Sequence, residues 1–183
     1  MGILLAFLPF IVFAVADRAL GPSEALILAA IVAVVLLLRD WLVLRKAPKI
    51  LDIGTTILFG GLACYALLGG PTGSIFGVRL AVDFGLLVIV LISMLIQRPF
   101  TLQYAREQVA PELWDSPTFI RTNYIITSVW AFAFAVMAAA DALLVFAPQV
   151  PTKVGIIITI LALVGAIRFT GWYPERVRQQ SAG

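Results

Sequence analysis

Long apolar stretches are the feature that most restricts the fold of this chain. Five segments are rich in Leu, Ala, Ile and Val and nearly free of charge: 25–44, 50–68, 75–97, 122–147 and 152–170. A helix of about 20 such residues crosses the roughly 30 Å hydrocarbon core of a bilayer. None of the segments alternates with the period of two that a barrel strand needs. We therefore expect an all-α, polytopic membrane helix bundle that forms a single domain over residues 1–183.

A sixth apolar segment, residues 2–16, is shorter and contains Pro9. Its Ala14-Val15-Ala16 resembles a signal-peptide cleavage site, but no Lys or Arg precedes the apolar run. We interpret the segment as a short first span, with a tilted or re-entrant segment as the alternative. The prediction is therefore six transmembrane helices, or five if residues 2–16 do not cross.

Composition narrows the possible functions. Of the 183 residues, 62% are hydrophobic and 13% are charged, whereas soluble domains are roughly 45–50% apolar and about 25% charged. This excludes a soluble enzyme, a nucleic-acid-binding domain and a disordered chain. Because the chain has no His and one Cys, Cys64, imidazole catalysis and thiolate metal clusters are excluded as well. We expect no catalytic residue, cofactor or metal, and as partners the lipid bilayer and other integral membrane proteins.

The basic residues predict an orientation, because loops rich in Lys and Arg stay in the cytoplasm. Ten fall on one side of the six-span arrangement and three on the other. The ten are Arg39, Arg45, Lys46, Lys49, Arg98, Arg106, Arg121, Arg168, Arg176 and Arg178, and the three are Arg18, Arg79 and Lys153. A multi-pass protein of the bacterial inner membrane with a cytoplasmic C-terminus is expected. The N-terminus is cytoplasmic with six spans and changes side with five.

Connections between the spans differ in length. Those on the outer side, at 21–23, 69–73 and 148–151, are short and contain Gly or Pro, which predicts antiparallel neighbours. The cytoplasmic segment 99–121 mixes aromatic and charged residues, as helices lying on a membrane surface do. We predict an interfacial helix there, with the anchors Phe100, Tyr104 and Trp114. Plain anchoring and a partner-docking surface are both open interpretations. Asp115-Ser116-Pro117 predicts a helix start.

Polar residues inside apolar spans are costly and need partners. Arg79 and Asp83 lie four residues apart, on one helix face. Asp83 and Asp141 lie at similar depths, so Arg79, Asp83 and Asp141 are expected to form a cluster in the outer leaflet. A second cluster near the inner surface would contain Asp52, Gln97, Asn123 and Arg168. The clusters can serve as a proton or ion path, or as tethers between helices.

Small residues predict where helices approach closely. Ala131, Ala135 and Ala139 recur every four residues, and Gly60 and Gly61 are adjacent in the segment 50–68. Such patterns let two backbones come into contact. Packing inside the bundle is the favoured interpretation, with a dimer interface as the alternative.

Several short motifs add a family resemblance. They are Phe7-Leu8-Pro9-Phe10-Ile11-Val12-Phe13, Arg45-Lys46, Phe59-Gly60-Gly61, Arg98-Pro99 and Trp130-Ala131 with Phe134. In these motifs, and in length and span order, the chain resembles the YciB family, also called intracellular septation protein A. It departs from the family pattern at Thr127 and Asp141, where the family has Asn, and in a longer segment around 105–122.

The resemblance implies a non-enzymatic inner-membrane protein that acts as a scaffold in cell-envelope biogenesis and division. No catalytic residues are assigned to that family, so none are carried over. Two other functions fit the residues: a small transporter or channel that uses Asp83 and Asp141, and an accessory subunit of a larger membrane complex.

Overall fold

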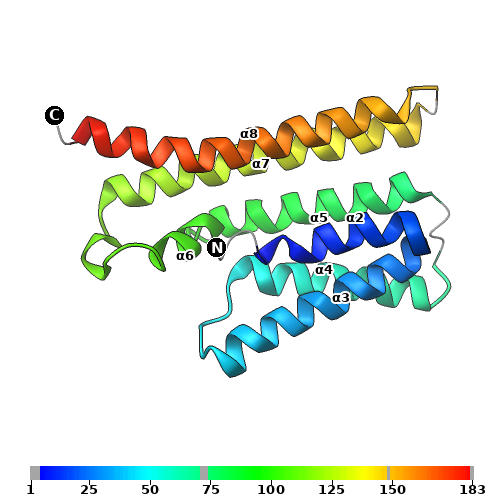
Figure 1. Ribbon diagram of the computed structural model, residues 1–183, viewed down its shortest axis with the longest axis horizontal. Helices are drawn as coiled ribbons and strands as arrows, with labels where there is room; N and C mark the ends of the chain where they lie inside the picture. The colour runs from blue at the N-terminus through cyan, green and yellow to red at the C-terminus, as the bar shows by residue number, and fades with distance from the viewer. Residues whose placement is uncertain (1–4, 71–73, 148, 182–183) are drawn as a thin grey trace. The chain divides into compact units, whose positions relative to one another are not determined.

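The computed structural model describes residues 5–70, 74–147 and 149–181 (Figure 1). All regular elements in these ranges are helical, which confirms the all-α prediction for this part of the chain. They are α2 (Leu8–Leu20), α3 (Pro22–Leu38), the π-helical η1 (Arg39–Val43), α4 (Ile50–Leu67), α5 (Ile75–Leu95), α6 (Phe100–Arg106), the 3-10 helix η2 (Pro111–Leu113), α7 (Pro117–Phe146) and α8 (Thr152–Ser181).

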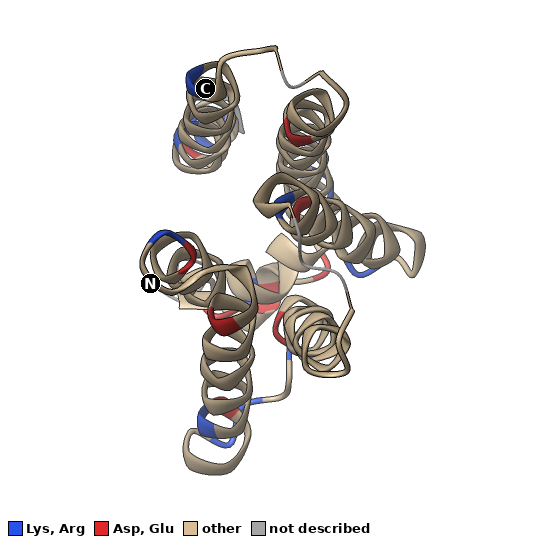
Figure 2. Ribbon diagram, turned by 90° about the vertical axis from the view of Figure 1, so that its right-hand side faces the viewer, with Lys and Arg blue, Asp and Glu red and all other residues tan. Residues whose placement is uncertain are grey.

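Five helices are long and apolar enough to cross a membrane. They are Pro22–Val43, Ile50–Leu67, Ile75–Leu95, Pro117–Phe146 and Thr152–Gln179. Each contains most of one long apolar segment predicted from the sequence, and charged residues are sparse along them (Figure 2). By length and composition the chain is therefore a multi-pass membrane protein.

The sixth span is not confirmed. The described part of the segment 2–16 contributes to α2, which has 13 residues and ends at Leu20. A helix of that length rises about 20 Å, less than the hydrocarbon core of a bilayer. Residues 2–4 of the predicted span lie outside the described residues, as do positions 71–73 and 148 of the predicted outer turns.

The start of α7 confirms one local prediction. Ser116 has an extended backbone and Pro117 is the first helical residue. The fixed φ of proline suits the first helical position, where the missing N–H costs no hydrogen bond. The Ser116 side chain makes no capping hydrogen bond. Proline therefore marks this helix start without help from a side-chain cap.

The chain divides into two compact units, a first unit that ends at Ile89 and a second unit that begins at Val90. Helix α5 runs across the division. In the first unit α3 packs against both α2 and α4, and in the second unit α7 packs against α8 and α6. Figure 1 shows α7 and α8 side by side along their length.

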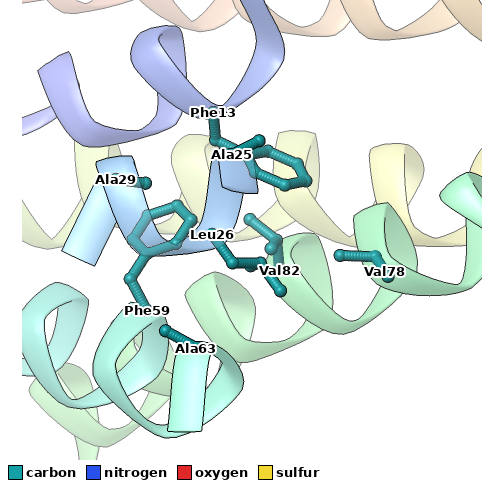
Figure 3. Packing of buried hydrophobic residues seen from close by; sticks show 8 residues of the cluster. All are labelled: Phe13, Ala25, Leu26, Ala29, Phe59, Ala63, Val78 and Val82. Carbon is teal, nitrogen blue, oxygen red and sulfur yellow. The ribbon is translucent and has the colours of Figure 1, made fainter. Parts of the chain in front are cut away.

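A small apolar cluster holds the first unit together (Figure 3). It contains Phe13, Ala25, Leu26, Ala29, Phe59, Ala63, Val78 and Val82. Phe59 of α4 is fully buried, and its ring centre lies 5.0 Å from that of Phe10 and 5.9 Å from that of Phe13. Aromatic rings at these separations attract one another beyond the area that they bury.

Two glycines let α4 and α5 approach closely. A Cβ atom added to Gly54 would lie 2.6 Å from Cγ2 of Ile89, and one added to Gly85 would overlap Cδ1 of Leu58. The glycines predicted for this purpose, Gly60 and Gly61, have open space where a Cβ atom would be. No contact among the described residues supports their assignment to helix packing, which therefore stays a prediction.

In the second unit a glycine of α8 allows a close contact with α7. Gly155 of α8 is buried, and a Cβ atom there would lie 2.5 Å from Cδ1 of Leu144. Of the predicted alanine stripe, Ala131 is buried, Ala135 is half-buried and Ala139 is exposed. The stripe therefore passes from a buried to an exposed position along α7.

Candidate functional site

The first unit contains part of the predicted outer cluster. Asp83 of α5 is buried with 9% of its surface exposed, and Arg79, one turn earlier, is half-buried. Asp17 of α2, 8% exposed, lies within electrostatic reach of the Arg79 guanidinium. Asp17 was not among the predicted cluster residues, because it directly follows the apolar segment 2–16 and so lies outside the predicted span. The Asp-Arg pair 17–18 was the available signal for a charged residue at the end of α2.

Asp141 is the third member of the predicted outer cluster. It lies on α7 in the second unit and is 1% exposed, which makes it the most deeply buried acidic side chain in the described part of the chain. Its burial is consistent with the predicted need for a polar neighbour. Its meeting with Arg79 and Asp83 of the first unit stays a prediction.

The members of the predicted inner cluster differ in their burial, and their meeting stays a prediction. Asn123 is buried, and its side-chain amide donates to the Phe119 carbonyl of its own helix at 2.9 Å. Gln97 and Arg168 are exposed. Asp52 lies in the first turn of α4, in the first unit, so its proximity to the other three stays a prediction.

Gln97 has a backbone role at the end of α5. Its φ of 58° places it in the left-handed region that glycine usually occupies after a helix. The N–H groups of Gln97 and Arg98 donate to the carbonyls of Met94 and Ser93 at 3.0 Å and 2.9 Å. This is the Schellman pattern, which satisfies carbonyls at a helix end. The Ser93 hydroxyl then accepts from the Phe100 N–H and directs the chain into α6.

Buried hydroxyl groups join α6 to α7. Oγ1 of Thr101 lies 3.0 Å from the Asn123 carbonyl oxygen and 2.7 Å from Oγ1 of Thr127. Because each hydroxyl has a single proton, Thr101 donates to the carbonyl and Thr127 donates to Thr101. Thr101 is 4% exposed and Thr127 is fully buried. The pair therefore fixes α6 on α7 with polar groups that water does not reach.

An aromatic cluster lies beside this hydroxyl pair. The Trp130 ring centre is 6.4 Å from that of Phe100 and 5.5 Å from that of Phe134. The Trp130 indole N–H donates to Oγ1 of Thr170 on α8 at 2.9 Å, and this hydroxyl donates to the Ala166 carbonyl. Trp130 thus connects α6, α7 and α8 through apolar and polar contacts together.

The aromatic side chains predicted as interfacial anchors do not share one environment. Phe100 is fully buried and Tyr104 is 3% exposed, because one face of α6 packs against α7. The anchor assignment is therefore wrong for these two residues, whose rings contact protein instead of lipid. Trp114 is half-buried under the Arg106 guanidinium, which lies 5.5 Å from its ring centre. The predicted single interfacial helix is replaced by α6, a turn and η2.

A second group of aromatic residues lies near the C-terminal end of α8. The rings of Phe169 and Tyr173 are stacked with their centres 5.0 Å apart, and Trp172 contacts both. The Arg176 guanidinium lies 5.1 Å from the Trp172 ring centre. Aromatic rings with adjacent Arg side chains are typical of the interface between membrane and water. None of the anchors predicted from the sequence belongs to this group.

Comparisons with protein-family models, with curated proteins and with solved structures found no match for this chain.

Proposed function

We propose that this chain is a non-enzymatic protein of the bacterial inner membrane that binds other envelope proteins as a scaffold in cell-envelope biogenesis and division. The resemblance of its motifs to septation protein A is one basis for this proposal. The other is the folded segment 99–116, which contains α6 and η2 and which we call the α6 platform.

The α6 platform carries the proposal because its two faces differ. One face is buried against α7 through Phe100, Thr101 and Tyr104. The other presents charged side chains, among them the exposed residues Glu107 and Glu112. A segment that is already ordered loses less conformational entropy when a partner binds than a flexible loop does. These features suit recognition of a partner at the membrane surface.

The positions of the tryptophans support the proposed orientation. Trp41 lies in η1, beside the basic residues 39 and 45–46, and it is 56% exposed. In the second unit Trp114 and Trp172 each lie below an Arg guanidinium. Tryptophans concentrate at membrane interfaces, and Lys and Arg concentrate on the cytoplasmic side. We therefore assign these helix ends to the cytoplasmic surface.

Site-specific photo-crosslinking tests the scaffold proposal. A photoreactive amino acid at Glu112, on the exposed face of η2, is expected to capture envelope-biogenesis or division proteins in native membranes. The same group at Gln149, an exposed residue in the connection between α7 and α8, provides the matched control on the opposite side. The proposal fails if Glu112 yields no protein adduct, or if both positions capture the same proteins.

Thiol labelling tests the orientation. In a Cys64→Ser background, single cysteines replace Glu112 or Gln149, and a charged thiol reagent that cannot cross the bilayer is added to vesicles. Gln149→Cys is expected to react in right-side-out vesicles and Glu112→Cys in inside-out vesicles, each at least tenfold faster than in the opposite preparation, because a bilayer blocks charged solutes. The reverse pattern would contradict the assigned orientation.

A further inference from the structure

Two contacts define how α7 and α8 are aligned. Near one end the Trp130 indole donates to Thr170, and near the other Leu144 lies against Gly155. The helices are antiparallel, so each step forward along α7 matches a step back along α8. Asp141 lies eleven residues after Trp130, and Thr159 lies eleven residues before Thr170. Eleven residues make about three helical turns. Asp141 and Thr159 therefore occupy facing positions, three turns from the Trp130–Thr170 contact.

The Thr159 hydroxyl differs from the Thr170 hydroxyl of the same helix and from the Thr56 hydroxyl of α4. Oγ1 of Thr170 donates to the Ala166 carbonyl at 2.8 Å, and Oγ1 of Thr56 donates to the Asp52 carbonyl at 2.8 Å. Oγ1 of Thr159 is buried and makes no hydrogen bond to the described part of the chain. A buried hydroxyl in this state costs free energy unless another polar group or a water molecule bonds to it.

The lengths of the facing side chains explain why Trp130 and Thr170 are hydrogen-bonded to each other whereas Asp141 and Thr159 are not. An indole carries its N–H far from the backbone, so Trp130 reaches Thr170 directly. An aspartate side chain is much shorter, and Asp141 does not bond to the Thr159 hydroxyl directly. Buried water typically occupies such a place, where it bonds to polar groups that cannot reach one another.

We propose that Asp141 and Thr159 bind one water molecule between α7 and α8. The water donates to a carboxylate oxygen of Asp141 and accepts the Thr159 hydroxyl proton. This second polar connection joins the ends of the two helices that lie away from the aromatic groups. It rests on the alignment of α7 with α8 and is independent of the scaffold proposal.

Solid-state NMR tests the water site directly. In a chain with ¹³C-labelled threonine in deuterated lipid vesicles, polarisation from water is expected to reach Thr159. Thr127 serves as the dry reference in the same spectrum, because it is fully buried and bonded to Thr101. Equal build-up of signal at Thr159 and Thr127 would overturn the proposal.

Substitutions at Asp141 identify what holds the water. Asp141→Leu is expected to reduce the transfer to Thr159 to the level of Thr127, whereas Asp141→Asn retains it because an amide still bonds to water. Unchanged transfer in Asp141→Leu would overturn the assignment of the carboxylate. If Asp141→Leu does not fold, Thr159→Val in a chain with ¹³C-labelled aspartate provides the same test, with loss of transfer to Asp141 as the expected result.

Cysteine cross-linking tests the alignment. In the Cys64→Ser background, Asp141→Cys with Thr159→Cys is expected to form a disulfide upon mild oxidation, because facing positions of packed helices come within disulfide range. Leu143→Cys with Ile160→Cys is the control, since both native side chains are exposed. Cross-linking of the control pair alone would overturn the proposal.

Discussion

Replacing Phe59 by alanine is expected to lower the free energy of unfolding by about 3–5 kcal/mol, the usual cost of removing a buried aromatic side chain. Phe59 is fully buried in the core of the first unit and contacts the rings of Phe10 and Phe13. The substitution removes both ring contacts and leaves a cavity, and the two costs add. Unfolding of the purified chain by SDS in mixed micelles measures the change.

Phe84 provides the matched control for this experiment. It lies on α5 and is 56% exposed, so it faces lipid or detergent. Because lipid tails are as apolar as the side chain, Phe84→Ala is expected to change the free energy of unfolding by less than about 1 kcal/mol. Equal losses of unfolding free energy in Phe59→Ala and Phe84→Ala would contradict the assignment of Phe59 to the core of the first unit.

Enlarging Gly54 to leucine is expected to destabilise the first unit by about 1–3 kcal/mol, as overpacking of a closed interface does. A Cβ atom at Gly54 would already lie within 3.0 Å of three side-chain atoms of Ile89. Two of these, Cγ1 and Cγ2, are bonded to the Cβ atom of Ile89, and a β-branched side chain in a helix strongly prefers one χ1 rotamer, so rotating them away is costly. The same SDS titration measures the loss.

Gly61 is the control for the Gly54 substitution. It lies two turns further along α4, and nothing lies within 4 Å of the place where its Cβ atom would be. Gly61→Leu is expected to be neutral or slightly stabilising, because leucine favours a helix more than glycine does. A larger loss for Gly61→Leu than for Gly54→Leu would show that α4 packs through its Gly60–Gly61 face.

The spans were predictable because membrane solubility depends on the length and hydropathy of a segment. Residues 50–68 and 75–97 correspond to α4 and α5 almost to their ends. The length of α8 was less predictable. Its last turns contain Pro174 and charged residues, which end an apolar segment but do not end the helix.

The contacting faces of the helices could not be predicted in the same way. All faces of an apolar helix carry similar apolar side chains, so the sequence does not show which face meets another helix. It therefore does not show that Gly54 contacts Ile89 while Gly61 faces outward. The same ambiguity affected Phe100, whose neighbouring charges suggested a surface position. The hydroxyl groups of Thr101 and Thr127 come from segments 26 residues apart, and nothing local in either segment indicates the pair.

The candidate polar residues were predictable one by one but not as clusters. Burial of Asp83 and Asp141 follows from their positions inside apolar segments. By contrast, the partners of a polar residue depend on helix rotation. Asn123 bonds to its own helix, and Gln97 occupies a left-handed backbone position at the end of α5. Helical spacing alone could not distinguish these roles from membership of a cluster.

The division of the chain within α5 bears on the order of biosynthesis. All residues of the small apolar cluster around Phe59 precede Ile89 in the chain. The whole cluster has therefore been synthesised by the time the ribosome reaches Ile89. Domains generally fold as units, beginning with the N-terminal part during synthesis. Helices α2 to α4 and the first part of α5 are thus expected to assemble in the bilayer before α7 and α8 are translated.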